Sequence, residues 1–219
     1  MYSVDLDFTG ERVVPGKTPD TIYREHMDRY VFAAAMSRDM VVLDVACGAG
    51  YGLARIMEAG AGRCVGVDVS LEAVAYSQRR YGRNGRTDFV CADGIRLPFA
   101  DGSYDAVVSF ETIEHLEYYE AFLLECGRVL RPGGLMICST PNKGVFSPDV
   151  ETPPNRFHVR EFWPDEFRTL LLAVFREVDL YGQCDVTLAD KSVERDRGIH
   201  DFRDDDEVSS AYVVAVARK

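Results

Sequence analysis

The sequence predicts a single α/β domain built on a doubly wound, mostly parallel sheet of seven strands, with an antiparallel last strand and helices on both faces. Apolar runs alternate with segments of helical spacing, which is typical of this fold class. The first run, VVLDVA at 41–46, is almost wholly apolar, as expected of a strand buried on both faces of a parallel sheet. A chain of 219 residues fits one such domain.

The expected elements follow in order along the chain. Strands are predicted at 41–46, 63–69, 87–91, 105–110, 135–139, 178–184 and 211–217. Helices are predicted at 24–37, 53–58, 71–81, 113–130 and 164–175, with Ser70 as the N-cap of the third. The last two strands have no helix between them, so they should pair as an antiparallel hairpin. Residues 141–158 form a long Pro/Asn/Gly-rich loop of the kind that is usually functional or mobile. Residues 185–210 are charged and predict a solvated excursion.

Composition limits the partners. The formal net charge is -11, and so acidic a surface repels phosphates, which argues against nucleic acid and anionic membrane as partners. No apolar run reaches the roughly 20 residues of a membrane helix. The first residues lack a basic-then-apolar signal pattern, so a cytoplasmic protein is expected. The six cysteines include no CxxC pair, which favours free thiols over zinc or disulfides.

A glycine-rich turn follows the first strand in VLDVACGAGYG, with Gly48, Gly50 and Gly52. Glycine permits a tight turn and lets a ligand lie against the backbone. The spacing is not the GxGxxG of dinucleotide sites, and Asp44 stands on the strand where it would repel a pyrophosphate. The turn therefore favours a ligand that carries a positive charge and no phosphates.

Two more acids end the second and third strands. Asp68 lies about 20 residues past the glycines, where an acid accepts hydrogen bonds from ribose hydroxyls, and Asp93 could bind an adenine amino group. One such Asp serves equally well as an N-cap or in a turn. Three acids at the carboxyl ends of strands, where open α/β sheets bind ligands, favour a binding site.

These motifs together resemble the class I S-adenosylmethionine-dependent methyltransferases, in particular the type 11 group. The resemblance rests on LDVACGAGYG, VGVDVS, CADGIRLPF, GSYDAVVSFETIEHL and RVLRPGGLMICSTPN, which cover 41–142 in the family's order. Ala46 departs from the glycine commonest at its position. The leader FTGERVVPG with EHMDRYVFAAA also resembles that of bacterial members associated with sugar and polysaccharide modification.

The resemblance implies a Rossmann-like fold, S-adenosylmethionine as cofactor and a separate role for each of three segments of the chain. Residues 1–40 would be an arm and lid helix, 41–142 the cofactor-binding core, and 143–219 the substrate-side loop, last helix and C-terminal hairpin. Arg29 is a candidate for the methionine carboxylate, or else forms a surface ion pair with Glu25. The implied cofactor contacts are Tyr23, His26, Arg29, Asp44, Ala46, Cys47, Gly48, Gly50, Asp68, Val69, Asp93, Gly94, Ile95, Phe110 and Glu111.

The stretch FETIEHL gathers ionisable groups where the fourth strand ends. A helix beginning near Thr112 would place Glu111, Glu114 and His115 on one side. Three interpretations stay open. The acids stabilise the N-terminus of that helix while His115 packs; or His115 or Glu111 acts as the general base; or the group holds a cation. His158 is expected to face the substrate.

The cation interpretation draws on a second resemblance. ExxEH is similar to a metal-binding run in small-RNA terminal ribose methyltransferases, and His158 stands at a comparable later place. Glu111, Glu114, His115 and His158 would then hold Mg²⁺ or Mn²⁺ and acidify a hydroxyl.

The expected function is O-methylation of a small hydroxylated molecule, with a sugar or glycan precursor first. The alternatives are methylation of nitrogen or carbon in another metabolite, a ribose methyltransferase of RNA, against which the charge of -11 counts, and a non-catalytic cofactor-binding module. The sequence leaves the oligomeric state open, a homodimer included.

Overall fold

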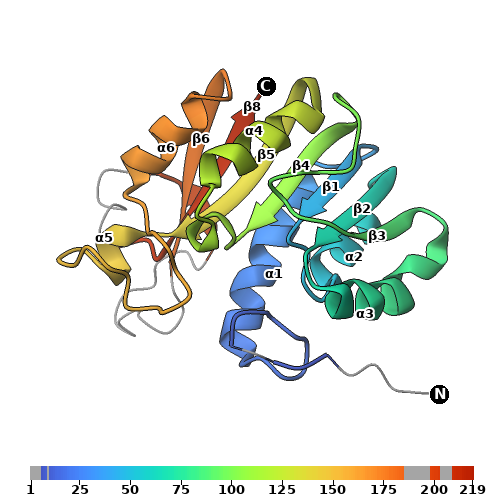
Figure 1. Cartoon of the computed structure of the whole chain (residues 1–219), viewed down its shortest axis with the longest axis horizontal. Coiled ribbons are helices and arrows are strands. Elements are labelled where there is room, and N and C mark those ends of the chain that lie inside the picture. The colour runs from blue at the N-terminus through green and yellow to red at the C-terminus, as the bar shows by residue number, and fades with distance from the viewer. Residues whose placement is uncertain (1–5, 9, 185–197, 203–208) are drawn as a thin grey trace.

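A computed structural model describes residues 6–8, 10–184, 198–202 and 209–219. These residues build one eight-stranded sheet flanked by helices (Figure 1). In sheet order the strands are β3 (Thr87–Cys91), β2 (Arg63–Asp68), β1 (Val41–Val45), β4 (Tyr104–Phe110), β5 (Leu130–Pro141), β8 (Tyr212–Arg218), β6 (Glu177–Gln183) and β7 (Ile199–Asp201). The α-helices are α1 (Asp20–Ala35), α2 (Tyr51–Glu58), α3 (Leu71–Tyr81), α4 (Tyr119–Val129), α5 (Lys143–Phe146) and α6 (Pro164–Leu172).

The sheet is mixed. Strands β1 to β5 pair in parallel, whereas β8 lies antiparallel between β5 and β6. The predicted parallel sheet with an antiparallel last strand is therefore confirmed. The count of seven strands is wrong, because the three-residue strand β7 pairs with β6 inside the stretch 185–210. A strand that short and polar leaves no periodic signal, and most of that stretch lies outside the described residues.

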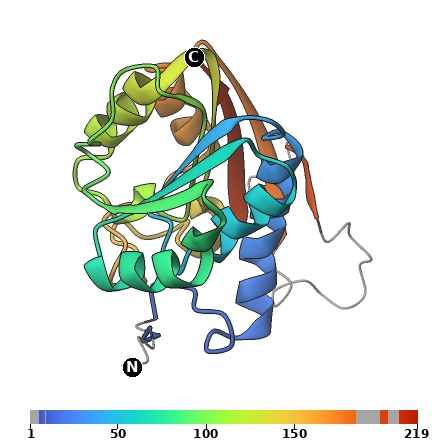
Figure 2. The same cartoon turned by 90° about the vertical axis from the view of Figure 1, so that its right-hand side faces the viewer.

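Helices cover both faces of the sheet, as Figures 1 and 2 show. Helices α1, α2 and α3 contribute to one apolar core, and α4 and α6 contribute to the other. Neighbouring residues of one strand supply opposite cores: Val42 belongs to the first and Leu43 to the second. This follows from the alternation of side chains along a strand, and it explains the nearly continuous apolar runs.

The predicted start of the helix at 113–130 is wrong. A 3₁₀ turn (Ile113–His115) ends at Leu116, whose backbone is extended, and α4 begins only at Tyr119. In an α-helix the carbonyl of Glu114 would accept the amide four residues on. Here it accepts the amide of Val159 at 2.7 Å instead. The tertiary contact thus replaces the first turn of the helix.

Other local predictions hold. Helix α3 has the predicted bounds, and Ser70 Oγ caps it by accepting the amide of Ala73 at 3.3 Å. Strand β3 also has the predicted bounds. Among the described residues, none of the helices combines the length and the apolar character that crossing a membrane requires.

Candidate active site

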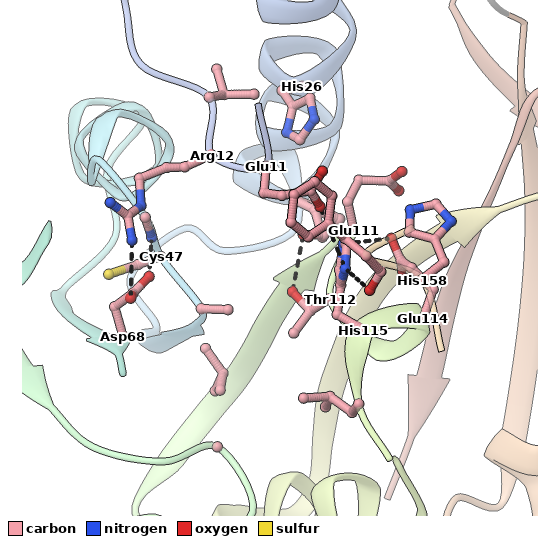
Figure 3. Close-up of a pocket in the computed structure, with 18 of the residues that line it drawn as sticks. Glu11, Arg12, His26, Cys47, Asp68, Glu111, Thr112, Glu114, His115 and His158 are labelled. Atoms are coloured by element: carbon pink, nitrogen blue, oxygen red, sulfur yellow. Dashed lines mark hydrogen bonds and ion pairs between the residues drawn. The ribbon is translucent and has the colours of Figure 1, made fainter. Parts of the chain in front are cut away.

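A cavity of about 960 Å³ opens at the carboxyl ends of the parallel strands. Its walls come from the residues that follow β1, β2, β3 and β4, from the arm before α1, from α1 itself and from the loop after β5 (Figure 3). This is the edge at which open α/β sheets bind ligands. Of the predicted site residues, the lining includes His26, Ala46, Cys47, Gly48, Asp68, Val69, Asp93, Gly94, Phe110, Glu111, Glu114, His115 and His158.

Asp68 organises the glycine turn. One carboxylate oxygen accepts the amide of Gly48 at 2.8 Å, and the other accepts the amide of Ser70 at 2.8 Å. Gly48 and Gly50 adopt left-handed backbone, with φ of 52° and 73°, and Ala46 does so with φ of 66°. Glycine takes this conformation without strain, whereas the alanine needs support from its surroundings. The turn therefore presents bare backbone to the cavity beside a carboxylate that still has free lone pairs.

Asp44 lies beneath the turn and outside the cavity lining. It is fully buried, and the hydroxyl of Tyr30 donates to Oδ2 at 3.1 Å while Oδ1 has no partner in the described structure. Burial, helped by the charge of Asp68 and opposed by the hydrogen bond from Tyr30, raises the pKa of Asp44 to about 8. At neutral pH this acid is largely protonated, so it supplies less negative charge than the sequence suggests.

Glu111 marks the point where β4 enters the cavity. Its φ is 51°, so the chain turns sharply at a residue other than glycine. The hydroxyl of Ser139, on β5, donates to Oε1 of Glu111 at 2.6 Å. Strain of this kind persists only where surrounding contacts hold it, and it is common at functional sites. The hydrogen bond from Ser139 thereby fixes the carboxylate of Glu111 at the end of β4.

Glu114 is a buried residue of the cavity lining. The hydroxyl of Thr140 donates to its Oε2 at 3.2 Å, and its Oε1 has no hydrogen-bond partner within the described residues. Burial, reinforced by the charge of Glu111, raises the pKa of Glu114 well above the ordinary range. The carboxyl therefore favours its neutral form.

His115 and His158 meet in the cavity edge to face, with ring centroids 4.9 Å apart. His115 Nδ1 lies 3.0 Å from the carbonyl oxygen of Phe157, and its Nε2 lies 3.8 Å from Oε1 of Glu114. His158 Nδ1 lies 2.7 Å from a carboxylate oxygen of Glu161, and its Nε2 lies 2.9 Å from the amide nitrogen of Asn155. His115 thus keeps one ring nitrogen unbonded, whereas both nitrogens of His158 are engaged.

The comparisons with known proteins agree with this geometry. Residues 43–138 match the family model described as a methyltransferase domain. A Mycolicibacterium smegmatis protein named "Probable S-adenosylmethionine-dependent methyltransferase" is 40% identical over 80% of this chain and 66% of its own length. A Mycobacterium tuberculosis protein of the same description is 40% identical over 81% of this chain and 64% of its own length. Residues 43–138 therefore belong to the methyltransferase-domain family, and the chain is similar to S-adenosylmethionine-dependent methyltransferases.

The similarity covers only part of these relatives, and its structural counterpart concerns the fold. The chain spans less than two thirds of the length of these mycobacterial methyltransferases, at 64% to 66%. A solved S-adenosylmethionine-dependent methyltransferase of Thermotoga maritima has a TM-score of 0.69 and 17% identity, over 90% of this chain and 91% of that one. At that identity the likeness concerns the fold, which is the Rossmann-like methyltransferase fold.

The cavity suits the methyl donor of this family. It combines a turn of exposed backbone, an acid at the end of β2 and a further acid, Asp93, after β3. Asp93 Oδ1 accepts the amide of Ile95 at 3.1 Å, which fixes the carboxylate, while Ile95 itself does not line the cavity. These are the groups that a ribose and an adenine amino group need.

The leading helix α1 differs from expectation. His26 lines the cavity, and burial lowers its pKa, helped by the charge of Arg29. Arg29 is 0% exposed and outside the lining, with Nη1 donating to Oε1 of Gln183 at 2.6 Å and its guanidinium 4.5 Å from the ring centre of Tyr212. The expected surface ion pair is therefore wrong, because α1 packs this face against β6 and β8. Tyr23 and Gly50 also lie outside the lining.

The arm before α1 supplies a positively charged side chain, Arg12, that the sequence analysis missed. Arg12 lines the cavity, with one guanidinium nitrogen 4.0 Å from Asp68 and its Cγ 3.4 Å from where a Cβ of Gly48 would stand. It is the one Lys or Arg among the described lining residues. Its neighbour Glu11 points the other way, with Oε2 3.6 Å from Nδ1 of His115. Both stand in the leader GERVVPG, but no periodicity there indicates which side chains face a site.

The candidate cation ligands converge only in part. Glu114, His115 and His158 offer ligand atoms within 4.8 Å of one another, and Glu111 is not part of this group. The candidate ligand atoms without a hydrogen bond are Oε1 of Glu114 and Nε2 of His115. Both nitrogens of His158 are engaged by Asn155 and Glu161. Holding a cation would require Asn155 to move, so the cation remains a prediction for a chelator experiment.

Proposed function

We propose that this chain transfers the methyl group of S-adenosylmethionine to a hydroxyl of a small molecule, with a sugar or glycan precursor as the first candidate. The sulfonium methyl is already activated, so the protein mainly has to align the acceptor. An alcohol keeps its proton at neutral pH and needs a base as the bond forms. The proposal therefore depends on a side chain in the cavity that can take this proton.

The observation that carries the proposal is the free nitrogen of His115. A carbonyl oxygen can only accept, so Nδ1 of His115 carries the proton toward Phe157 at 3.0 Å. The neutral ring then holds its lone pair on Nε2, in a side chain that is 28% exposed and lines the cavity. A lone pair held in this way can accept the proton of an acceptor hydroxyl.

Cofactor binding is assigned to the turn and the acids on the other side of the cavity. Gly48 would approach the methionine portion, Asp68 the ribose, and Asp93 with Gly94 the adenine. Arg12, rather than the buried Arg29, is the side chain placed to reach a carboxylate. Phe110 and Glu111 would separate the donor from the acceptor.

Apolar and acidic side chains in the cavity lining suit a small hydroxylated acceptor without phosphates. Phe146 and Tyr212 pack with ring centroids 5.8 Å apart and give an apolar surface, and Phe157 adds to it. Glu11 supplies a carboxylate that accepts hydrogen bonds from hydroxyls and repels phosphates.

A panel of sugars, phenols and amines tests the proposal, with S-adenosylhomocysteine as the measured product. We expect product with a hydroxylated acceptor, and we expect His115→Gln to lower turnover about 10²- to 10⁴-fold while S-adenosylmethionine still binds. Product from amines alone, at a rate that His115→Gln leaves intact, would instead support N-methylation. If no acceptor of any class yields product, the chain is a cofactor-binding module.

The same panel run with EDTA tests the cation. Turnover that EDTA leaves unchanged excludes the cation interpretation. Turnover that EDTA abolishes and Mn²⁺ restores would assign Glu114, His115 and His158 to metal binding.

A further inference from the structure

The loop 154–161 contributes a series of connected hydrogen bonds that runs from Glu161 through His158 and Asn155 to Phe157, whose carbonyl binds His115. We propose that Asn155 and His158 are positioning residues that set the tautomer of His115 through the carbonyl of Phe157. This inference rests on the proposed function only for its effect on turnover. The tautomer itself can be measured without any substrate.

The first link fixes the orientation of Asn155. Its Oδ1 accepts the amide of Phe157 at 3.0 Å, so its amide nitrogen must be the atom that lies 2.9 Å from Nε2 of His158. An amide nitrogen can only donate. Nε2 of His158 therefore carries the lone pair, and the ring proton is on Nδ1.

The second link holds His158 from behind. Its Nδ1 proton points at Glu161, 2.7 Å away, and Glu161 is only 3% exposed. The hydroxyl of Ser147 donates to the other oxygen of that carboxylate. His158 therefore has both nitrogens committed, and its ring joins Glu161 to Asn155.

The third link passes from the loop to the base. Asn155 holds the amide of Phe157, and the carbonyl of the same residue accepts the Nδ1 proton of His115 at 3.0 Å. The loop is also anchored at the 3₁₀ turn, where the amide of Val159 donates to the carbonyl of Glu114 at 2.7 Å. The backbone of Phe157 is thus held at its amide and flanked by a second anchor at Val159, and its carbonyl can hold His115 only while this arrangement persists.

The chain of bonds gives His158 a role different from the one expected of it. With both ring nitrogens engaged, it is poorly placed to take a proton from an acceptor. It instead keeps Asn155, and through Asn155 the carbonyl of Phe157, in the position that leaves Nε2 of His115 unprotonated and facing the cavity. Fixing the tautomer of a catalytic histidine through a hydrogen bond to its other nitrogen is a recurrent requirement.

The test compares three full-length variants with the wild type. Asn155→Leu removes both side-chain bonds, Asn155→Asp keeps an acceptor for the amide of Phe157, and Thr152→Ala is an exposed change in the same loop outside the cavity lining. The ¹⁵N shifts of the His115 ring are read by long-range proton–nitrogen NMR at about pH 8.5, roughly two units above the ordinary imidazole pKa. His115→Gln assigns the signals, and thermal unfolding confirms that each variant is folded.

We expect the Nδ1–H tautomer in the wild type and in Thr152→Ala, a mixture of tautomers in Asn155→Leu, and partial recovery in Asn155→Asp. Turnover of a hydroxylated acceptor should fall about tenfold in Asn155→Leu, part of the total contribution of a general base, with affinity for S-adenosylmethionine unchanged. A pure Nδ1–H tautomer in folded Asn155→Leu overturns the inference. A changed tautomer with unchanged turnover leaves the positioning role intact and removes His115 as the base.

Discussion

The two sides of the cavity are built by different means. On the cofactor side, the turn and Asp68 follow parallel strands whose pairing is regular from Val41 opposite Arg63 to Val45 opposite Val67. On the acceptor side, His115 is held by a carbonyl 42 residues away in the sequence. Backbone pairing places the first side and side-chain bonds between distant segments place the second, so the two sides should fail in different ways.

The largest effect is expected from a steric clash on the cofactor side, which backbone pairing holds in place. A Cβ at Gly52 would lie 2.1 Å from the ring of Tyr30, which is buried against Tyr51 and Phe110. Gly52→Ala should therefore destabilise the fold by about 1–3 kcal/mol and weaken S-adenosylmethionine binding as Tyr30 is displaced. Urea unfolding and calorimetric titration measure the two effects.

The matched control for that variant is Gly198→Ala, where a Cβ would meet no heavy atom within 4 Å. It should leave stability and binding unchanged. Wild-type stability in Gly52→Ala would show that Tyr30 can move freely, and the cofactor side would then depend less on backbone packing than we infer.

A second test of the cofactor side uses pH. The pKa of Asp44 is raised to about 8 by burial, whereas in the unfolded chain it is about 3.9. Between these values the folded state holds a proton that the unfolded state releases, so the free energy of unfolding contributed by Asp44 falls as pH rises from about 4 to about 8. Asp44→Asn cannot ionise, and its unfolding free energy should fall less steeply over this range. Parallel pH profiles for the two proteins, from urea unfolding, would contradict the raised pKa.

The same division explains which parts of the molecule the sequence predicts. Ser70, the bounds of α3 and the acid at Asp68 follow from patterns within a few residues, and all three stand where expected. The predicted start of the helix at 113–130 is wrong because the amide of Val159, 45 residues after Glu114, donates to the carbonyl of Glu114. Short-range periodicity carries no information about such a partner.

Side chains on α1 show most clearly what the sequence pattern does not predict. Helical spacing correctly predicts that α1 exists, but it does not show that Arg29 would be buried with Gln183 on a strand 154 residues later. Nor does it reveal Arg12 and Glu11, which come from an irregular arm. The side chains of the acceptor side depend on which segments meet, and only the folded arrangement supplies that.

The acceptor side should be sensitive to single side-chain bonds. Glu161→Gln keeps the shape of the side chain but replaces a charge-assisted bond to His158 with a neutral one, a loss of about 1 kcal/mol. Turnover of a hydroxylated acceptor should fall about fivefold, and affinity for S-adenosylmethionine should not change. Glu151→Gln, at an exposed position of the same loop, is the control. Equal losses in cofactor affinity and turnover would show that the two sides are not separable.

The smallest effect is expected for a carboxylate bond of similar length in the strands that carry the cofactor side, away from the cavity. Asp88, on β3, accepts from Arg63, on β2, at 2.8 Å, with side chains 49% and 60% exposed. Exposed pairs of this kind contribute about 0–1 kcal/mol, and the backbone of β2 and β3 pairs without them. Asp88→Asn should therefore change stability by less than about 1 kcal/mol and leave both cofactor affinity and turnover at the wild-type level. If it lowered turnover as much as Glu161→Gln does, side-chain bonds would matter equally on both sides, and the contrast between a backbone-built and a side-chain-built half would not hold.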